Sequence, residues 1–320
     1  MQRFDGINQL IAHEWMAESI TPSYAWVRYI LCCGVKPEAF GATYKQFKVI
    51  RQAFGRRALI LPVNFHPHNS ERIDFEFSAS QDDGGLKVGI SDSKLHIPGG
   101  PHFLIVVESD EAESGNSNAK CLEITDAIEA LLRCCLGANA VFHVNGNYHM
   151  KLPDGEFGIV SDDLHLFGAE ESTRTDENSI SLVGEMLAAY ESIPAVLRMR
   201  FLLAFSWINK AFREHELIYY LTAFEILAGS YKKDRVYKLL ADAYAFNKPQ
   251  KFAIKFHLEH IYKLRHNYIH NGRYVSMTPV GSSYLLAIFH DMARKLAGLE
   301  CNEYADRIRK SKNIRLEFAQ

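Results

Sequence analysis

The stretch "KFAIKFHLEHIYKLRHNYIHNG" at residues 251–272 decides how the second half of this chain folds. Its apolar residues recur at helical spacing, and Asn271-Gly272 is a natural left-handed stop. The spacing predicts one long helix whose end carries the polar residues Arg265, His266, Asn267 and His270. On a regular helix Arg265 and His270 would point about 140° apart. They can share a target only if the last turn unwinds, or if they line opposite sides of a groove completed by a second subunit.

The segments on either side of this stretch are helical as well, and Gly229 is expected to end one of them. Their sequences are "SISLVGEMLAAYESI" (179–193), "AVLRMRFLLAFSWINKAF" (195–212), "HELIYYLTAFEILAGS" (215–230), "RVYKLLADAYAF" (235–246) and "YLLAIFHDMARKLAGL" (284–299). Together they predict an all-helical C-terminal domain over 179–320, an up-down bundle around two long helices.

The N-terminal residues 1–178 have a different pattern, which predicts a mixed domain and an α+β fold class for the whole chain. We expect helices at 7–20, 24–33 and 124–137, and strands at 58–63, 72–77, 103–108 and 140–144. Asn145-Gly146 favours a hairpin turn after the last of these strands. The polar segment 168–179 is expected to be a linker or long loop.

Charge is distributed unevenly along the chain, although the formal net charge is only −2. Residues 194–320 hold 21 Lys+Arg and 11 Asp+Glu, so the remainder holds 15 and 27. The basic half is therefore the better partner for a polyanion, unless the asymmetry is accidental. The six cysteines show no C-x-x-C spacing, the first residues contain no apolar signal segment, and no apolar run is uninterrupted enough to span a membrane. We therefore expect a cytoplasmic protein without a membrane anchor.

A family resemblance emerges at the end of the long helix. Arg265, a polar neighbour, three further residues and His270 resemble the signature of the HEPN superfamily. The flanking "IYKLRHNYIHNGR" and the upstream "YYLTAFEILAGSY" are similar to the Apea-like HEPN group. The resemblance covers about residues 195–300, and His266 stands where this group more often has asparagine.

The resemblance implies a metal-independent ribonuclease without a cofactor, acting as a homodimer through its helical domain. RNA supplies its own nucleophile, the 2′-hydroxyl, so the products would be a 2′,3′-cyclic phosphate and a 5′-hydroxyl. His270 would exchange protons, Arg265 would hold the phosphate, and His266 or Asn267 would position it. Glu225 would orient Arg265 or His270 from a neighbouring helix. By analogy, the protein would be a defence or toxin-like effector, with a regulatory partner or ligand at residues 1–178.

Basic residues near this motif are expected to contact RNA phosphates. They are Lys232, Lys233, Arg235, Lys238, Arg273, Arg307, Arg309 and Lys310. For His66 and His68 we expect a solvated loop, and for His143 and His149 a pair across two strands, in preference to a metal site. We therefore expect no metal.

Two alternatives remain open from the sequence. Cations are favoured at any helix C-terminus, so Arg265, His266 and His270 could have this role alone. The helical domain could also bind RNA or a nucleotide without cutting, or serve only for dimerisation.

Overall fold

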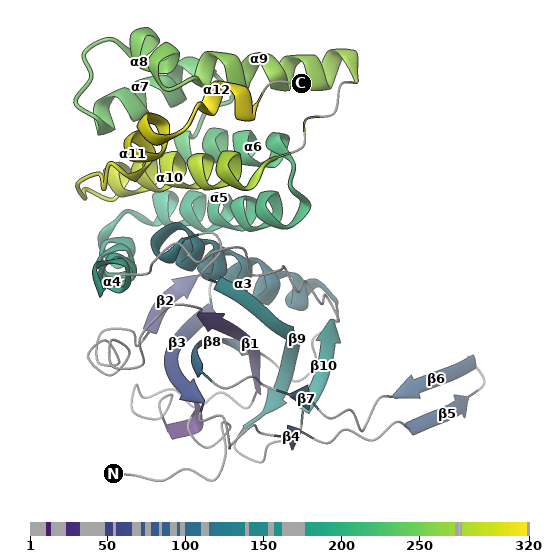
Figure 1. Ribbon diagram of the computed structural model, residues 1–320. Coiled ribbons are helices and arrows are strands. Elements are labelled where there is room, and N and C mark those ends of the chain that lie inside the picture. Colours follow the sequence, from purple (N-terminus) through teal and green to yellow (C-terminus); the bar gives the residue numbers. More distant parts are fainter. Residues whose placement is uncertain are drawn as a thin grey trace. The chain divides into compact units, whose positions relative to one another are not determined.

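The protein is described by a computed structural model, in which the chain forms two compact units (Figure 1). The residues that the structure describes are 11–13, 24–32, 49–53, 56–65, 72–73, 78–82, 85–89, 95–96, 100–109, 115–137, 141–152, 157–161, 177–272, 275 and 277–318. The first unit comprises 1–49, 56–121 and 142–174, and the second comprises 50–55, 122–141 and 175–320. The fold class is α+β, as expected.

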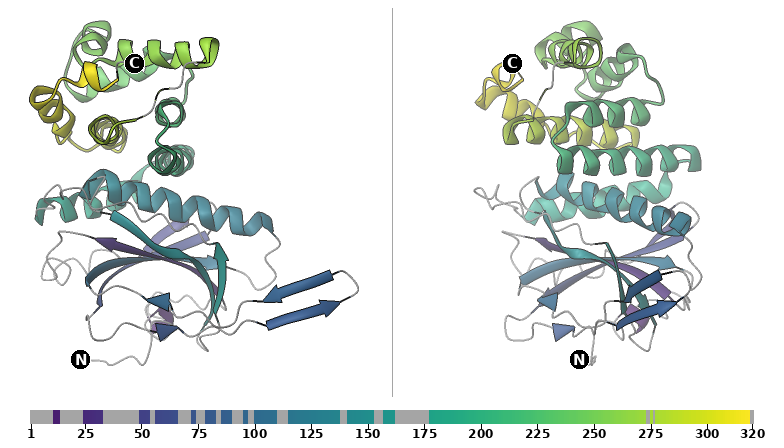
Figure 2. Two further views of the ribbon diagram at one scale, coloured as in Figure 1. Left: turned by 45° about the vertical axis from the view of Figure 1, so that its right-hand side comes forward. Right: turned by 90° about the vertical axis from the view of Figure 1, so that its right-hand side faces the viewer.

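A twisted sheet forms the centre of the first unit (Figure 2). Strand β8 (Gly100–Ser109) lies antiparallel between β1 (Tyr24–Cys32) and β3 (Arg56–Phe65). The full strand order is β10-β9-β1-β8-β3-β2, where β2 is Val49–Ala53, β9 is Val141–Lys151 and β10 is Phe157–Ser161. Two small ladders pair β4 (Arg72–Ile73) with β7 (Leu95–His96), and β5 (Ser78–Asp82) with β6 (Gly85–Gly89).

Two predictions in this unit are wrong. Residues 24–33 were expected to be helical, but residues 24–32 form β1. Residues 25–30 are all buried, so neither an alternating nor a helical apolar face shows in the sequence. Asn145-Gly146 does not turn the chain, because β9 continues through it as one strand. Of the helix expected at 7–20, the structure describes only residues 11–13, which are helical.

Other expected segments fall partly or wholly outside the described residues. Strands β3, β8 and β9 match three of the expected strands, and of the fourth only residues 72–73 are described. The expected linker at 168–179 is described only from residue 177, where a helix begins. The boundary predicted between residues 178 and 179 remains a prediction. Helix α3 (Gly115–Leu136) precedes that boundary in the sequence, but its residues 122–136 belong to the second unit.

Apart from residues 50–53 of β2 and Val141 of β9, the regular elements of the second unit in its described part are helices, as the sequence predicts for residues 179–320. Its further helices are α4 (Glu177–Ser192), α5 (Ala195–Glu214), α6 (Leu217–Ala228), α7 (Lys233–Ala243), α8 (Pro249–Lys255), α9 (Leu258–Asn271), α10 (Pro279–Leu296), α11 (Tyr304–Ser311) and α12 (Ile314–Glu317). Gly229 ends α6 in the left-handed conformation at φ +65°, as expected.

Helix α10 is the core of this unit, because it is buried from Tyr284 to Arg294. The Phe289 ring packs edge-on against Phe205 of α5 and Phe224 of α6, with ring centroids 5.0 and 5.6 Å apart. Edge-to-face pairs of this kind add to the free energy gained by burial. They hold α5 and α6, and with them Glu225, in a fixed position.

The long helix predicted over 251–272 is two helices, α8 and α9, with a break at His257. His257 adopts a left-handed backbone with φ +58°. Phe256 stacks on Phe252, one turn earlier, with centroids 4.1 Å apart, and the Phe256 carbonyl at the break accepts a hydrogen bond from Tyr284 Oη at 2.8 Å. Tertiary packing thus overrides a continuous helical pattern that contains no glycine or proline at this point.

Among the helices in the described ranges, none combines the length and the apolar character needed to span a bilayer.

Candidate functional site

Arg265 is held at the interior face of α9. Leu258, Ile261 and Tyr262 are the buried residues of this helix, and Arg265 follows on the same face. Its guanidinium meets Glu225 of α6, with Nη1 donating to Oε1 at 2.5 Å and Nη2 to Oε2 at 3.2 Å. This two-pronged geometry fixes the plane of the guanidinium as well as its position. The pairing of Arg265 with Glu225 matches the arrangement expected for an orienting carboxylate.

The ion pair is largely removed from water. The side chain of Arg265 is 26% exposed and that of Glu225 is 11% exposed. Burial raises the pKa of Glu225 above its usual value, while Arg265 acts in the opposite direction. The Nε atom of Arg265 is buried and has no hydrogen-bond partner within the described residues. Glu225 therefore orients the guanidinium without satisfying all of its donors.

His266 and His270 form a second group, on the exposed face of α9. Their rings lie 4.3 Å apart between centroids, tilted by 45°, as their spacing of four residues requires. In Figure 1 the C-terminal end of α9 extends beyond α6, and both histidines are exposed.

The last turn of α9 does not unwind. Gly272 N donates to Tyr268 O at 3.1 Å, and Gly272 adopts φ +62° only after the helix has ended. Arg265 and His270 therefore keep their separation of about 140°. No hydrogen bond or ion pair joins the two side chains in the part of the chain that is described. Asn267 accepts a hydrogen bond from Asn271 Nδ2 at 3.5 Å, on the side of the helix away from Arg265.

The basic residues expected to contact RNA differ in how available they are. Lys232, Arg235 and Lys238 are exposed at the start of α7. Lys233 is also exposed, but its Nζ lies 3.1 Å from a carboxylate oxygen of Glu259. These residues leave a basic edge on α7.

Helix α11 is less available for phosphates. Asp306 holds Arg309 and Lys310, each with a nitrogen 2.6 Å from one of its carboxylate oxygens. Arg307 is exposed, with its guanidinium 5.5 Å from the centroid of the Tyr304 ring. Arg273 lies outside the described residues.

The sequence did not point to a small hollow beside Arg265. It is lined by Glu216, Leu217, Ile218, Arg265, Tyr268 and Val275. An aromatic group continues from it along the α5–α6 hairpin, where the Trp207 and Tyr219 rings lie 5.6 Å apart. In a sequence, aromatic residues at helical spacing are typical of core positions, so no signal separates these from Phe205 or Phe224.

A buried thiol–imidazole–amide arrangement also occurs in the helical unit. Asn302 Nδ2 donates to His290 Nδ1 at 3.3 Å, and His290 Nε2 lies 3.5 Å from Cys135 Sγ. Because Asn302 Oδ1 already accepts from Tyr304 N, His290 must carry its proton on Nε2 and cannot accept the thiol proton. Burial lowers the pKa of His290 to about 3 and raises that of Cys135. This group stabilises the core and is not a nucleophile.

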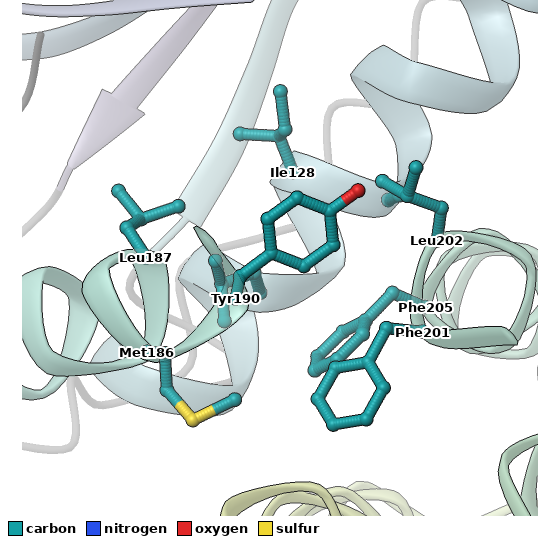
Figure 3. A pocket seen from close by; sticks show the side chains of 9 residues that line it. Ile128, Met186, Leu187, Tyr190, Phe201, Leu202 and Phe205 are labelled. Carbon is teal, nitrogen blue, oxygen red and sulfur yellow. The ribbon is translucent and has the colours of Figure 1, made fainter. Parts of the chain in front are cut away.

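An apolar cavity lies between α3, α4 and α5 (Figure 3). Ile128, Met186, Phe201 and Leu202 line it together with Tyr190, whose buried hydroxyl has no hydrogen-bond partner in the described part of the chain. No charged side chain lines the cavity, so it offers no catalytic group.

The described residues contain no cluster of three or more histidine, cysteine or acidic side chains that could hold a metal ion. His66, His68 and Arg273 lie outside the described residues. His143 and His149 lie on the same strand, β9, so the expected pair across two strands is wrong. Ser109 Oγ lies 2.8 Å from His149 Nε2.

Comparisons with protein-family models, with curated proteins and with solved structures gave no match.

Proposed function

We propose that the helical unit is a metal-independent endoribonuclease of the HEPN type. The observation that supports this most is the ion pair of Arg265 with Glu225, which presents an oriented arginine in the same end of α9 as the exposed pair His266 and His270. The Glu-bearing helix, the arginine and the histidine occur in the order that this superfamily would require. A helix end that merely favoured cations would not need a buried carboxylate to orient one of them.

The chemistry suits these side chains. The 2′-oxygen of RNA forms a bond to phosphorus while the bond from phosphorus to the 5′-oxygen breaks. An imidazole can accept the 2′-hydroxyl proton or donate a proton to the departing 5′-oxygen, and we assign this role to His270. Arg265 would hold the phosphate while negative charge builds on it, and His266 or Asn267 would position it.

The regular end of α9 favours a composite site. Arg265 and His270 of one chain face different directions, which supports a site in which one phosphate contacts Arg265 of one chain and His270 of another. The proposal therefore includes a homodimer through the helical unit, RNA as the substrate, and residues 1–178 as the part that receives a regulatory partner or ligand. We place such an enzyme in the cytoplasm, as a defence or toxin-like effector.

Cleavage in the presence of a chelator tests the activity. Purified protein incubated with single-stranded RNA and EDTA should release fragments ending in a 2′,3′-cyclic phosphate. His270→Ala should abolish this cleavage, while Lys251→Ala, an exposed position on α8, should cleave like the wild type. Cleavage that needs a divalent metal ion, or that persists in His270→Ala, would exclude the proposed mechanism.

Complementation tests the composite site. Arg265→Ala and His270→Ala chains, each inactive alone, should regain part of the activity when mixed, because a mixed dimer contains one complete set of groups. If the mixture stays inactive although mixed dimers form, the two groups must act within one chain.

A second candidate is a non-catalytic module that binds RNA or a nucleotide, or dimerises, within a defence complex. It is favoured by Glu225, which occupies both Nη atoms of Arg265 and partly neutralises its charge. In that case the protein would bind the same RNA but leave it intact.

A further inference from the structure

The two exposed imidazoles at the end of α9 are placed to share one metal ion. His266 and His270 are four residues apart in a regular helix, so they lie on one face, and their ring centroids are 4.3 Å apart. Two histidines at this helical spacing are a recurring way of binding zinc. Imidazole nitrogen suits Zn²⁺, Cu²⁺ and Ni²⁺, whereas Mg²⁺ and Ca²⁺ prefer oxygen ligands.

The distance between the rings suits a shared ion after a small adjustment. With Zn–N bonds of about 2.0–2.1 Å and tetrahedral angles, two imidazoles on one ion have centroids about 5 Å apart. The rings therefore need to separate by less than about 1 Å. Both residues are exposed, and within the described part of the chain no hydrogen bond or ion pair fixes either ring. Rotation of the side chains can thus make the adjustment.

The backbone under the pair needs no change. The last turn of α9 is regular up to its stop, with Gly272 N donating to Tyr268 O at 3.1 Å. Both Cα atoms are therefore already in the positions from which two imidazoles one turn apart can reach the same ion. A site that needs no refolding loses little free energy on binding to ordering of the chain.

The pair supplies two ligands and leaves the other coordination positions open. In the described part of the chain no third histidine, cysteine or carboxylate joins it, so it is not a closed site with four protein ligands. Lys263 is exposed one turn before His266, and its charge opposes that of a bound cation. Both features favour an ion that binds and leaves, in contrast to a permanent structural metal.

We propose that His266 and His270 bind one divalent transition-metal ion, and that the bound ion switches the nuclease off. The second part rests on the proposed function. A metal ion on His270 occupies the nitrogen lone pair that accepts and returns protons. The residue can then neither take the proton of the 2′-hydroxyl nor deliver one to the 5′-oxygen. The ion is an inhibitor and not a cofactor, which is consistent with cleavage that needs no metal.

Binding is measured on metal-free protein without RNA. Titration with Cu²⁺, followed by electron paramagnetic resonance, should show one ion per chain with nitrogen ligands. Because removal of either imidazole leaves a single point of attachment, His266→Ala and His270→Ala should each bind about 100-fold more weakly or worse. His260→Ala removes another histidine of α9, about 9 Å away along the helix, and should bind like the wild type. Circular dichroism shows whether each variant is folded.

Cleavage gives a second readout. In buffer without chelator, a few equivalents of Zn²⁺ should suppress cleavage of single-stranded RNA by the wild type and by His260→Ala. Excess EDTA should restore the activity, and Mg²⁺ at the same concentration should not inhibit. Any activity that His266→Asn retains should need about 100-fold more Zn²⁺ for half-inhibition, since an amide is a poor substitute for the second imidazole.

Three results separate this inference from the proposed function. If folded His266→Ala and His270→Ala bind Cu²⁺ as tightly as the wild type, the shared site is wrong and the nuclease proposal is unaffected. If the pair binds the ion but Zn²⁺ leaves cleavage unchanged or accelerates it, the switch is wrong. If the pair binds the ion and the wild type never cleaves RNA, the metal site stands, but the nuclease and its switch are wrong.

Discussion

The coupling between Glu225 and Arg265 can be measured directly, and it decides whether the arginine is oriented by the fold. We consider Glu225→Gln, Arg265→Met and the double variant. Glutamine retains an acceptor but no charge, and methionine retains much of the apolar length of arginine. From these three variants and the wild type, a double-mutant cycle gives the free energy with which the two side chains stabilise each other.

The expected magnitude follows from the geometry and burial of the pair. Breaking a fully buried ion pair costs about 3–5 kcal/mol, and an exposed pair contributes about 0.2–1 kcal/mol. With the side chains of Arg265 and Glu225 exposed by 26% and 11%, and with two hydrogen bonds between them, this pair lies between these limits. We therefore expect a coupling free energy of about 1–3 kcal/mol.

The pH dependence gives an independent check. Burial already raises the pKa of Glu225, and removing Arg265 removes the effect that opposes burial. In Arg265→Met the folded-state pKa of Glu225 should rise further, so the folded state holds a proton that the unfolded state has released. The deficit in stability of Arg265→Met relative to the wild type should therefore shrink as the pH is lowered from about 8 to about 5.

Urea unfolding followed by far-ultraviolet circular dichroism provides the free energies, because the helical unit dominates that signal. A coupling free energy below about 0.5 kcal/mol would place the pair among weak exposed ion pairs. Arg265 would then not be positioned by Glu225, and the main support for the proposed function would be lost.

Three further predictions concern other parts of the helical unit. Gly272→Ala, at φ +62° with nothing within 4 Å of the new Cβ, should lower the free energy of unfolding by about 1 kcal/mol in urea through backbone strain alone; an unchanged stability would contradict the left-handed stop at the end of α9. Burial raises the pKa of Asp291 to about 6. Ionisation of this carboxyl group therefore destabilises the folded state as the pH rises toward that value. The unfolding free energy of Asp291→Asn relative to the wild type should thus increase by roughly 2–3 kcal/mol between about pH 4 and about pH 8, and a flat difference would disprove the shift. Lys238→Ala should lower the slope of log affinity for oligouridine against log salt by about 1, whereas Arg309→Ala, whose guanidinium is held by Asp306, should change it less; the reverse order would move the phosphate contacts to α11.

The sequence predicted the helices well where one face is apolar and a glycine ends the segment. Gly229 and Gly272 both adopt the left-handed backbone expected of a helix stop. The sequence was misleading where burial is complete. Residues 25–30 of β1 are buried on both faces, even Arg28, so no periodicity remains to distinguish a strand from a helix. At His257 nothing local ends the helix, and the break depends on the packing of Phe256 against residues far along the chain.

For the candidate site, the sequence predicted the members of the group better than their arrangement. The family resemblance implied that Glu225 would orient Arg265 or His270, and the structure pairs it with Arg265. The contact between the Trp207 and Tyr219 rings had no such signal. The two residues are separated in sequence, and only the packing of α5 against α6 brings their rings together.

A second chain that completes the proposed site at the end of α9 would also cover the exposed apolar side chain of Ile269. A regular helix places Ile269 about 40° from Arg265 and about 100° from His270, so it lies between the two groups. Ile269 is 51% exposed. Fully burying an isoleucine contributes about 1.5–3 kcal/mol, so covering the exposed half would contribute about 1 kcal/mol. A second chain that packs on Ile269 must therefore lie within reach of both Arg265 and the histidines, which is the geometry that the proposed two-chain site needs.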